Sequence, residues 1–151
     1  MAGSINFIND RQMCVFDFKF FGPFKALSGG EDGCLMAPFD LEICAIAFKL
    51  RQCGTGGNTE VDMHKLTTAG VDAGTVFSTT IKCAHNEINE KTFYTNFIDS
   101  SKNDVDQAAS HLPIMSDANR LVDAGENLRL DIVSNATDAF DLQVTVFYRP
   151  R

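Results

Sequence analysis

Two segments near the end of the chain, in which apolar and polar residues alternate, constrain the fold most. They are residues 128–132 and 142–148. Their apolar rows are Leu128, Leu130 and Ile132 in the first segment, and Leu142, Val144, Val146 and Tyr148 in the second. Alternation with a period of two places one row on a buried face of a strand and the other row toward water. Turn-forming residues lie between the two segments, so the pattern predicts a final β-hairpin with one buried face.

Further strand-like segments precede this hairpin and are separated by turn clusters. Residues 14–20 alternate, residues 41–50 are apolar on both faces, and residues 59–66 alternate again after a glycine-rich turn. We expect the second and third of these segments to form a hairpin-like pair. In the longest segment, the pattern places on one face Glu42, Cys44, Ile46, Phe48 and Leu50. Short strands with little helical periodicity predict an all-β protein: an antiparallel β-sandwich of about eight strands, with a jelly roll as the leading arrangement.

The chain has 151 residues, which is the size of one domain. We assign residues 1–151 to a single β-sandwich domain whose core sandwich lies in residues 41–151. Residues 1–40 form a possible arm and loop region for assembly contacts, because residues 22–38 are rich in glycine and proline and long loops are commonly functional. Two interpretations of the phenylalanines in and beside this loop stay open. They fold back on their own core, or some of them dock on another subunit.

The composition excludes several classes of partner. The formal net charge is −7, with 20 acidic and 13 basic residues, whereas nucleic-acid binding requires an excess of Lys and Arg on one face. No apolar run approaches the ~20 residues of a membrane span, and the first residues lack the features of a secretory signal. The five cysteines form no C-x-x-C pair, so we expect free thiols in a protein made in a reducing cytoplasm. We predict neither a nucleic-acid nor a membrane partner.

The sequence carries no recognisable catalytic, cofactor or metal motif. The glycine-rich turn at residues 54–57 is not followed by the lysine and helix that a phosphate-binding loop needs. His64, His85 and His111 lack the spacing of a zinc site. A Cys–His nucleophile pair stays open, because such pairs converge in space. We predict a protein that is not an enzyme, with no catalytic residues, no cofactor and no metal.

Residues 99–106 resemble the beginning of a calcium loop, with oxygen-bearing side chains at alternate positions. The sixth position is Asp104 rather than glycine, and the twelfth is Ser110 rather than glutamate, which excludes an EF-hand. A looser calcium site and a solvated acidic loop both stay open for this segment.

A series of motifs runs from residue 53 to the end of the given sequence. A Gly-rich turn followed by Thr-Glu-Val-Asp lies in residues 53–65, and a Gly-Thr-x-Phe-Ser motif lies in residues 74–78. An Ala-Gly turn precedes an alternating strand in residues 121–131, with Glu126 where we expect aspartate. The last strand, in residues 141–151, contains Tyr-Arg near its end. In this order the motifs resemble those of small, jelly-roll-like β-sandwich virion structural proteins of tailed bacteriophages.

The resemblance implies a non-enzymatic structural protein of the virion that is made in the host cytoplasm. Its expected role is that of a capsid decoration or cement subunit, which stabilises the shell through protein–protein contacts. The expected partners are further copies of the chain, as a homotrimer or another symmetric oligomer, and the major capsid protein or a neighbouring virion protein. The interface residues that we expect are Phe16, Phe18, Phe20, Phe24, Arg149 and Arg151.

Two other classes of function stay open. The first is a tail or fibre component that binds a host surface or a glycan, because jelly rolls often carry lectin sites in their end loops. The second is a cupin-like metalloenzyme, which would require metal ligands that cluster in the fold.

Overall fold

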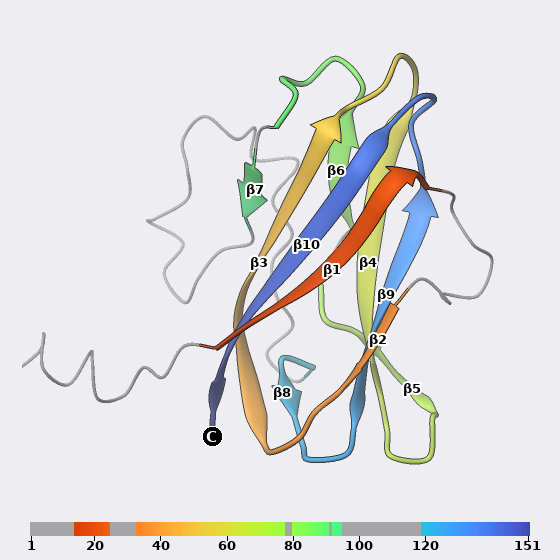
Figure 1. Cartoon of the computed structure of the whole chain (residues 1–151). Coiled ribbons are helices and arrows are strands. Elements are labelled where there is room, and N and C mark those ends of the chain that lie inside the picture. Colours follow the sequence, from red (N-terminus) through yellow and green to blue (C-terminus); the bar gives the residue numbers. More distant parts are fainter. Residues whose placement is uncertain (1–13, 25–32, 78–79, 91, 95–118) are drawn as a thin grey trace, which may run out of the picture.

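The computed structural model describes residues 14–24, 33–77, 80–90, 92–94 and 119–151, which form two antiparallel β-sheets (Figure 1). The strands of the first sheet are β1 (Cys14–Pro23), β3 (Leu41–Gln52), β7 (Thr92–Tyr94), β8 (Leu121–Val122) and β10 (Phe140–Pro150). The strands of the second sheet are β2 (Gly33–Met36), β4 (Asn58–Leu66), β5 (Asp72–Thr75), β6 (Ile81–Ala84) and β9 (Asn127–Ser134). No helix in these residues is long and apolar enough to cross a membrane.

The strand order is that of a jelly roll. The first sheet has the order β1-β10-β3-β7, and β8 also pairs with β3. The second sheet has the order β2-β9-β4-β5, and β6 also pairs with β4. Since β7 and β8 share one edge of β3, and β5 and β6 share one edge of β4, each sheet has four strand positions. The predictions of an all-β protein and of an antiparallel β-sandwich are therefore confirmed.

The predicted hairpins are wrong. β9 pairs with β2 and β4, whereas β10 pairs with β1 and β3, so the two alternating segments near the end of the chain lie in different sheets. β3 and β4 are likewise divided between the sheets. In a jelly roll, consecutive strands cross from one layer to the other, and both layers turn their apolar rows toward the same core. Alternation therefore identifies the inward face of a strand but does not identify its hydrogen-bonding partner.

The sequence predicts that Glu42 and Cys44 share a face of β3 with Ile46, Phe48 and Leu50, and this grouping does not hold along the whole strand. The core contains Leu41 and Ile43 from the first half of the strand, and Ile46, Phe48 and Leu50 from the second. The pairing with β10 changes register here, because neighbouring residues Phe147 and Tyr148 pair with Ala45 and Ile43, and Cys44 is the extra residue. Such a β-bulge reverses the facing of every residue on one side of it.

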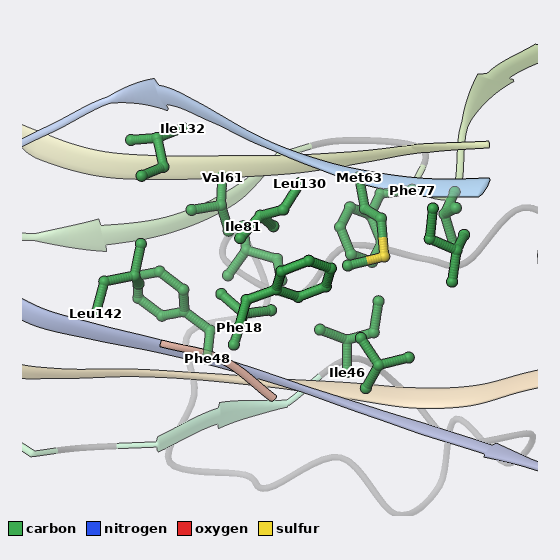
Figure 2. Close-up of a cluster of buried hydrophobic side chains, with 14 of the residues drawn as sticks. Phe18, Ile46, Phe48, Val61, Met63, Phe77, Ile81, Leu130, Ile132 and Leu142 are labelled. Carbon is green, nitrogen blue, oxygen red and sulfur yellow. The ribbon is translucent and has the colours of Figure 1, made fainter. Parts of the chain in front are cut away.

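Apolar side chains from both sheets meet in a single core (Figure 2). The first sheet contributes Phe18, Ile46, Phe48 and Leu142, and the second contributes Val61, Met63, Leu130 and Ile132. All eight side chains are buried. Removal of this apolar surface from water is the main favourable contribution to folding, and it fixes the two sheets face to face.

Candidate assembly surface

One side of the sandwich is built from the early part of the chain. β1 is the last strand of the first sheet, and β2 is the last strand of the second. The Phe18 ring of β1 reaches β2, because a Cβ added to Gly33 would meet Cδ1 of Phe18 at 2.6 Å. The described residues between 14 and 36, which fall in the region predicted for assembly, thus form both edges of one side of the molecule.

This side exposes apolar side chains beside open strand edges. The exposed fractions are 54% for Val15, 83% for Phe21 and 61% for Met36. Within the described residues, β1 pairs only with β10, and β2 pairs only with β9. An edge strand presents unpaired N–H and C=O groups to any strand that approaches, and soluble monomers usually protect such edges with charges, prolines or covering segments. The open edges and the exposed apolar side chains beside them leave this side available to another strand or subunit.

The four phenylalanines predicted at an interface are turned toward the core. Phe18 and Phe24 are buried, and Phe16 and Phe20 pack against the core while partly exposed. Phe16 and Phe18 meet edge to face, with 5.0 Å between their ring centroids. These rings hold β1 on the sandwich, and their role in contacts between subunits stays a prediction. The exposed aromatic residue of the strand is Phe21, which belongs to the opposite row.

The outward row of β1 also contains one charge of each sign. Lys19 Nζ lies 3.4 Å from Asp17 Oδ2, and Thr145 Oγ1 of β10 donates a hydrogen bond of 2.6 Å to Asp17 Oδ1. The hydrogen bond from Thr145 is the main reason that the pKa of Asp17 lies below its usual value, although burial opposes it. Asp17 is therefore held as a carboxylate on the open face of the sheet.

The two predicted terminal arginines make ion pairs within the subunit. Arg149 Nε donates a hydrogen bond of 2.7 Å to Glu42 Oε2, and Arg120 pairs with the other oxygen of the same carboxylate. Arg151 pairs with Asp123, and its backbone N–H donates a 3.0 Å hydrogen bond to the carbonyl of Asp40. The last residues of the chain are thereby fixed beside β3.

Glu42 is the centre of this arrangement, and its replacement by glutamine is expected to lower the free energy of unfolding by about 2 kcal/mol. The side chain is 12% exposed, and the substitution leaves Arg120 and Arg149 facing a neutral group. The loss is smaller than for a fully buried pair, because both arginines reach solvent. Glu60→Gln is the matched control, since Glu60 pairs with the more exposed Lys82 and its loss should cost less than about 1 kcal/mol. Urea unfolding of the two variants measures the difference, and equal losses would contradict it.

A surface pocket of about 240 Å³ lies at one end of the first sheet. Its lining combines the exposed ring of Phe21 with the cations Lys19, Lys49 and Arg51 and the carboxylate of Asp141. Arg51 Nη1 lies 3.2 Å from Asp141 Oδ2. The hydrogen bond from the Gly22 N–H is the main cause that holds the pKa of Asp141 below its usual value. The pocket thus joins one exposed aromatic ring to several fixed polar groups.

A polar network covers the outer face of the second sheet. His64 Nδ1 lies 2.9 Å from Asp72 Oδ2, and His64 Nε2 lies 3.4 Å from Asp62 Oδ2 and 3.6 Å from Asp131 Oδ2. Arg129 Nε donates a 2.8 Å hydrogen bond to Asp131, which raises the pKa of the arginine. The network links side chains of three neighbouring strands, β4, β5 and β9. Alternation in β4 and β9 was the available signal for it, but the sequence did not show which strands are neighbours.

Of the remaining candidates from the sequence, His85 lies within the residues that the structure describes. His85 Nδ1 lies 3.1 Å from the carbonyl oxygen of Gly57, in a turn. His111 and the calcium-like residues 99–106 lie outside the described residues. Among the residues that the structure describes, no group of three or more His, Cys, Asp or Glu side chains could hold a metal ion.

Comparisons of the chain with models of known protein families and with curated proteins found no match. The functional argument therefore depends on the fold, on the surfaces described above and on the motifs of the sequence.

Proposed function

We propose that this protein is a non-enzymatic structural subunit of a phage virion, which decorates the capsid and stabilises it through protein–protein contacts. The observation that carries the proposal is the side formed by β1 and β2. It combines two open strand edges with exposed apolar side chains, which is the surface chemistry of a subunit that assembles. The jelly-roll strand order supports the proposal, because this architecture recurs in viral capsid proteins. The resemblance of the motif series, which covers roughly residues 41–151, also supports the proposal.

The proposed partners are further copies of the chain and the major capsid protein or a neighbouring virion protein. A decoration subunit must make many weak contacts at repeated positions, so an extended edge suits the role better than a deep pocket does. The acidic composition of the chain suits a protein that is made in large amounts and stays soluble before assembly.

Capsids that lack this subunit provide the direct test. Purified protein should cosediment with them at saturable stoichiometry, and Met36→Ser should weaken that binding by about tenfold or more. Val71→Ser is the matched control, since Val71 has the same 61% exposure as Met36 but precedes β5, at the opposite edge of the second sheet. Absence of binding by the unaltered protein would reject the proposal. Equal effects of the two substitutions would reject the assignment of this side as the capsid contact.

A tail or fibre component that binds a glycan is the second candidate, and the pocket beside Phe21 favours it. An exposed aromatic ring can stack on a sugar, and Arg51, Asp141 and Gln143 can hydrogen-bond its hydroxyl groups. Binding of the unaltered protein to immobilised glycans, without binding to capsids, would favour this candidate over the first.

A further inference from the structure

The open edge of β1 is long enough to pair with another strand. β1 extends over ten residues from Cys14 to Pro23, and in the described part of the chain it forms a ladder on one side only, with β10. This ladder is regular from Cys14 to Phe20 and shifts its register before Pro23. Figure 1 shows β1 as the outermost strand of its sheet. Alternate residues of such a strand direct their N–H and C=O groups away from the sheet, where a second antiparallel strand can accept and donate the same hydrogen bonds.

The outward row of β1 is complementary to itself when it is reversed. Its members in chain order are Val15, Asp17, Lys19 and Phe21, so the row reads apolar, acidic, basic, apolar. A second β1 that lies antiparallel and is centred on Phe18 places Lys19 of the partner subunit opposite Asp17. It also places Phe21 of the partner subunit opposite Val15. Each charge then meets the opposite charge, and each exposed apolar side chain meets another.

Neighbouring registers lack this complementarity. An antiparallel pair centred on Asp17 places the partner subunit's Asp17 opposite the same residue, and a pair centred on Lys19 brings two lysines together. Like charges directly opposite each other destabilise a strand pair. A centre between two residues would set the core-facing row of one copy beside the solvent-facing row of the other. The charges of β1 therefore select the register that is centred on Phe18.

We propose that two copies of this chain associate through β1, by antiparallel strand pairing centred on Phe18, into a dimer with one continuous sheet. The inference rests on the proposed assembly role and names the partner of the β1 edge as a second copy. A strand pair with twofold symmetry uses the same surface of both subunits and closes on itself, so it produces a dimer. At the centre of the pair, Asp17 of each subunit forms an ion pair with Lys19 of the other. The apolar side chains at both ends of the row are covered.

Charge reversal on the full-length protein tests the inference by sedimentation velocity. Asp17→Lys and Lys19→Asp should each raise the dimer dissociation constant by about tenfold or more, because each brings like charges together in the paired strands. The double variant Asp17→Lys/Lys19→Asp should dimerise as the unaltered protein does, and an equimolar mixture of the two single variants should form a heterodimer. Lys49→Asp is the matched control, because Lys49 lies on β3, away from the edge, and should leave the dimer unchanged.

The inference fails if the unaltered protein stays monomeric at every concentration up to roughly millimolar, which is the weak end of specific association. It also fails if the double variant does not regain the dimer, or if Lys49→Asp weakens the dimer as much as Lys19→Asp does. Asp17 accepts hydrogen bonds from β10, so Asp17→Lys can disturb folding. In that case the comparison of Lys19→Asp with Lys49→Asp decides whether the inference holds. A dimer that forms in solution while capsid binding is absent would reject the virion role and retain the strand pairing.

Discussion

Replacement of Phe48 by alanine is expected to lower the free energy of unfolding by about 3–5 kcal/mol, the range found when a large buried aromatic side chain is truncated. Phe48 is fully buried in the middle of β3 and lies in the core where side chains of both sheets meet (Figure 2). The substitution removes the apolar contacts of the ring and leaves a cavity that close-packed sheets fill only in part. Urea denaturation followed by circular dichroism measures the change.

The control for this prediction is Phe21→Ala, which removes the same atoms from a side chain that is 83% exposed. Its effect on stability should remain within about 0.5 kcal/mol when it is measured at low protein concentration. A loss below about 1 kcal/mol for Phe48→Ala would contradict the position of this ring between the two sheets. A large loss for Phe21→Ala would show that its ring is covered within the subunit.

Strands β3 and β10 show how far the sequence determines the fold. The apolar row of β10 follows from alternation, as does the grouping of Ile46, Phe48 and Leu50 on one face of β3, and both agree with the structure. The sequence did not show the β-bulge at Cys44, because a bulge is defined by the register against a neighbouring strand. It also did not show that consecutive strands change sheets, because a row of apolar residues packs equally well from either layer.

The candidate surface was predictable as a region but not in its residues. The early part of the chain was identified by its loop composition and its phenylalanines, and the structure places β1 and β2 on one side of the sandwich. Which row of β1 faces outward depends on the sheet that covers the strand. That sheet is formed by residues distant in the sequence, so the residues of β1 alone do not determine it. Asp17 and Lys19 gained importance only once β1 was known to be an edge strand, since their order matters only for a second strand at that edge.

The glycine-rich turn at residues 54–57 has a structural explanation that the sequence alone could not supply. The backbone of Thr55 donates a 2.7 Å hydrogen bond to the carbonyl oxygen of Thr137, and Thr137 donates one of 2.8 Å to Gly56. The turn that follows β3 is therefore held against the turn that precedes β10. Gly54 lies at the closest point of approach, with a positive φ of 102°.

Gly54→Ala is therefore expected to lower the free energy of unfolding by about 2–4 kcal/mol. A Cβ at this position would lie 2.4 Å from the carbonyl oxygen of Thr137 and 3.0 Å from Cβ of Ala136, and the positive φ adds backbone strain. Gly70→Ala is the matched control, because Gly70 also has a positive φ, of 77°, but a Cβ there would meet no atom within 4 Å. That variant carries only the backbone strain, about 1–2 kcal/mol. Thermal and urea unfolding of both variants separate the contribution of the close approach from that of φ. Equal losses in the two variants would mean that the turns at residues 54–57 and 135–139 can move apart, and that their contact does not hold this end of the sandwich together.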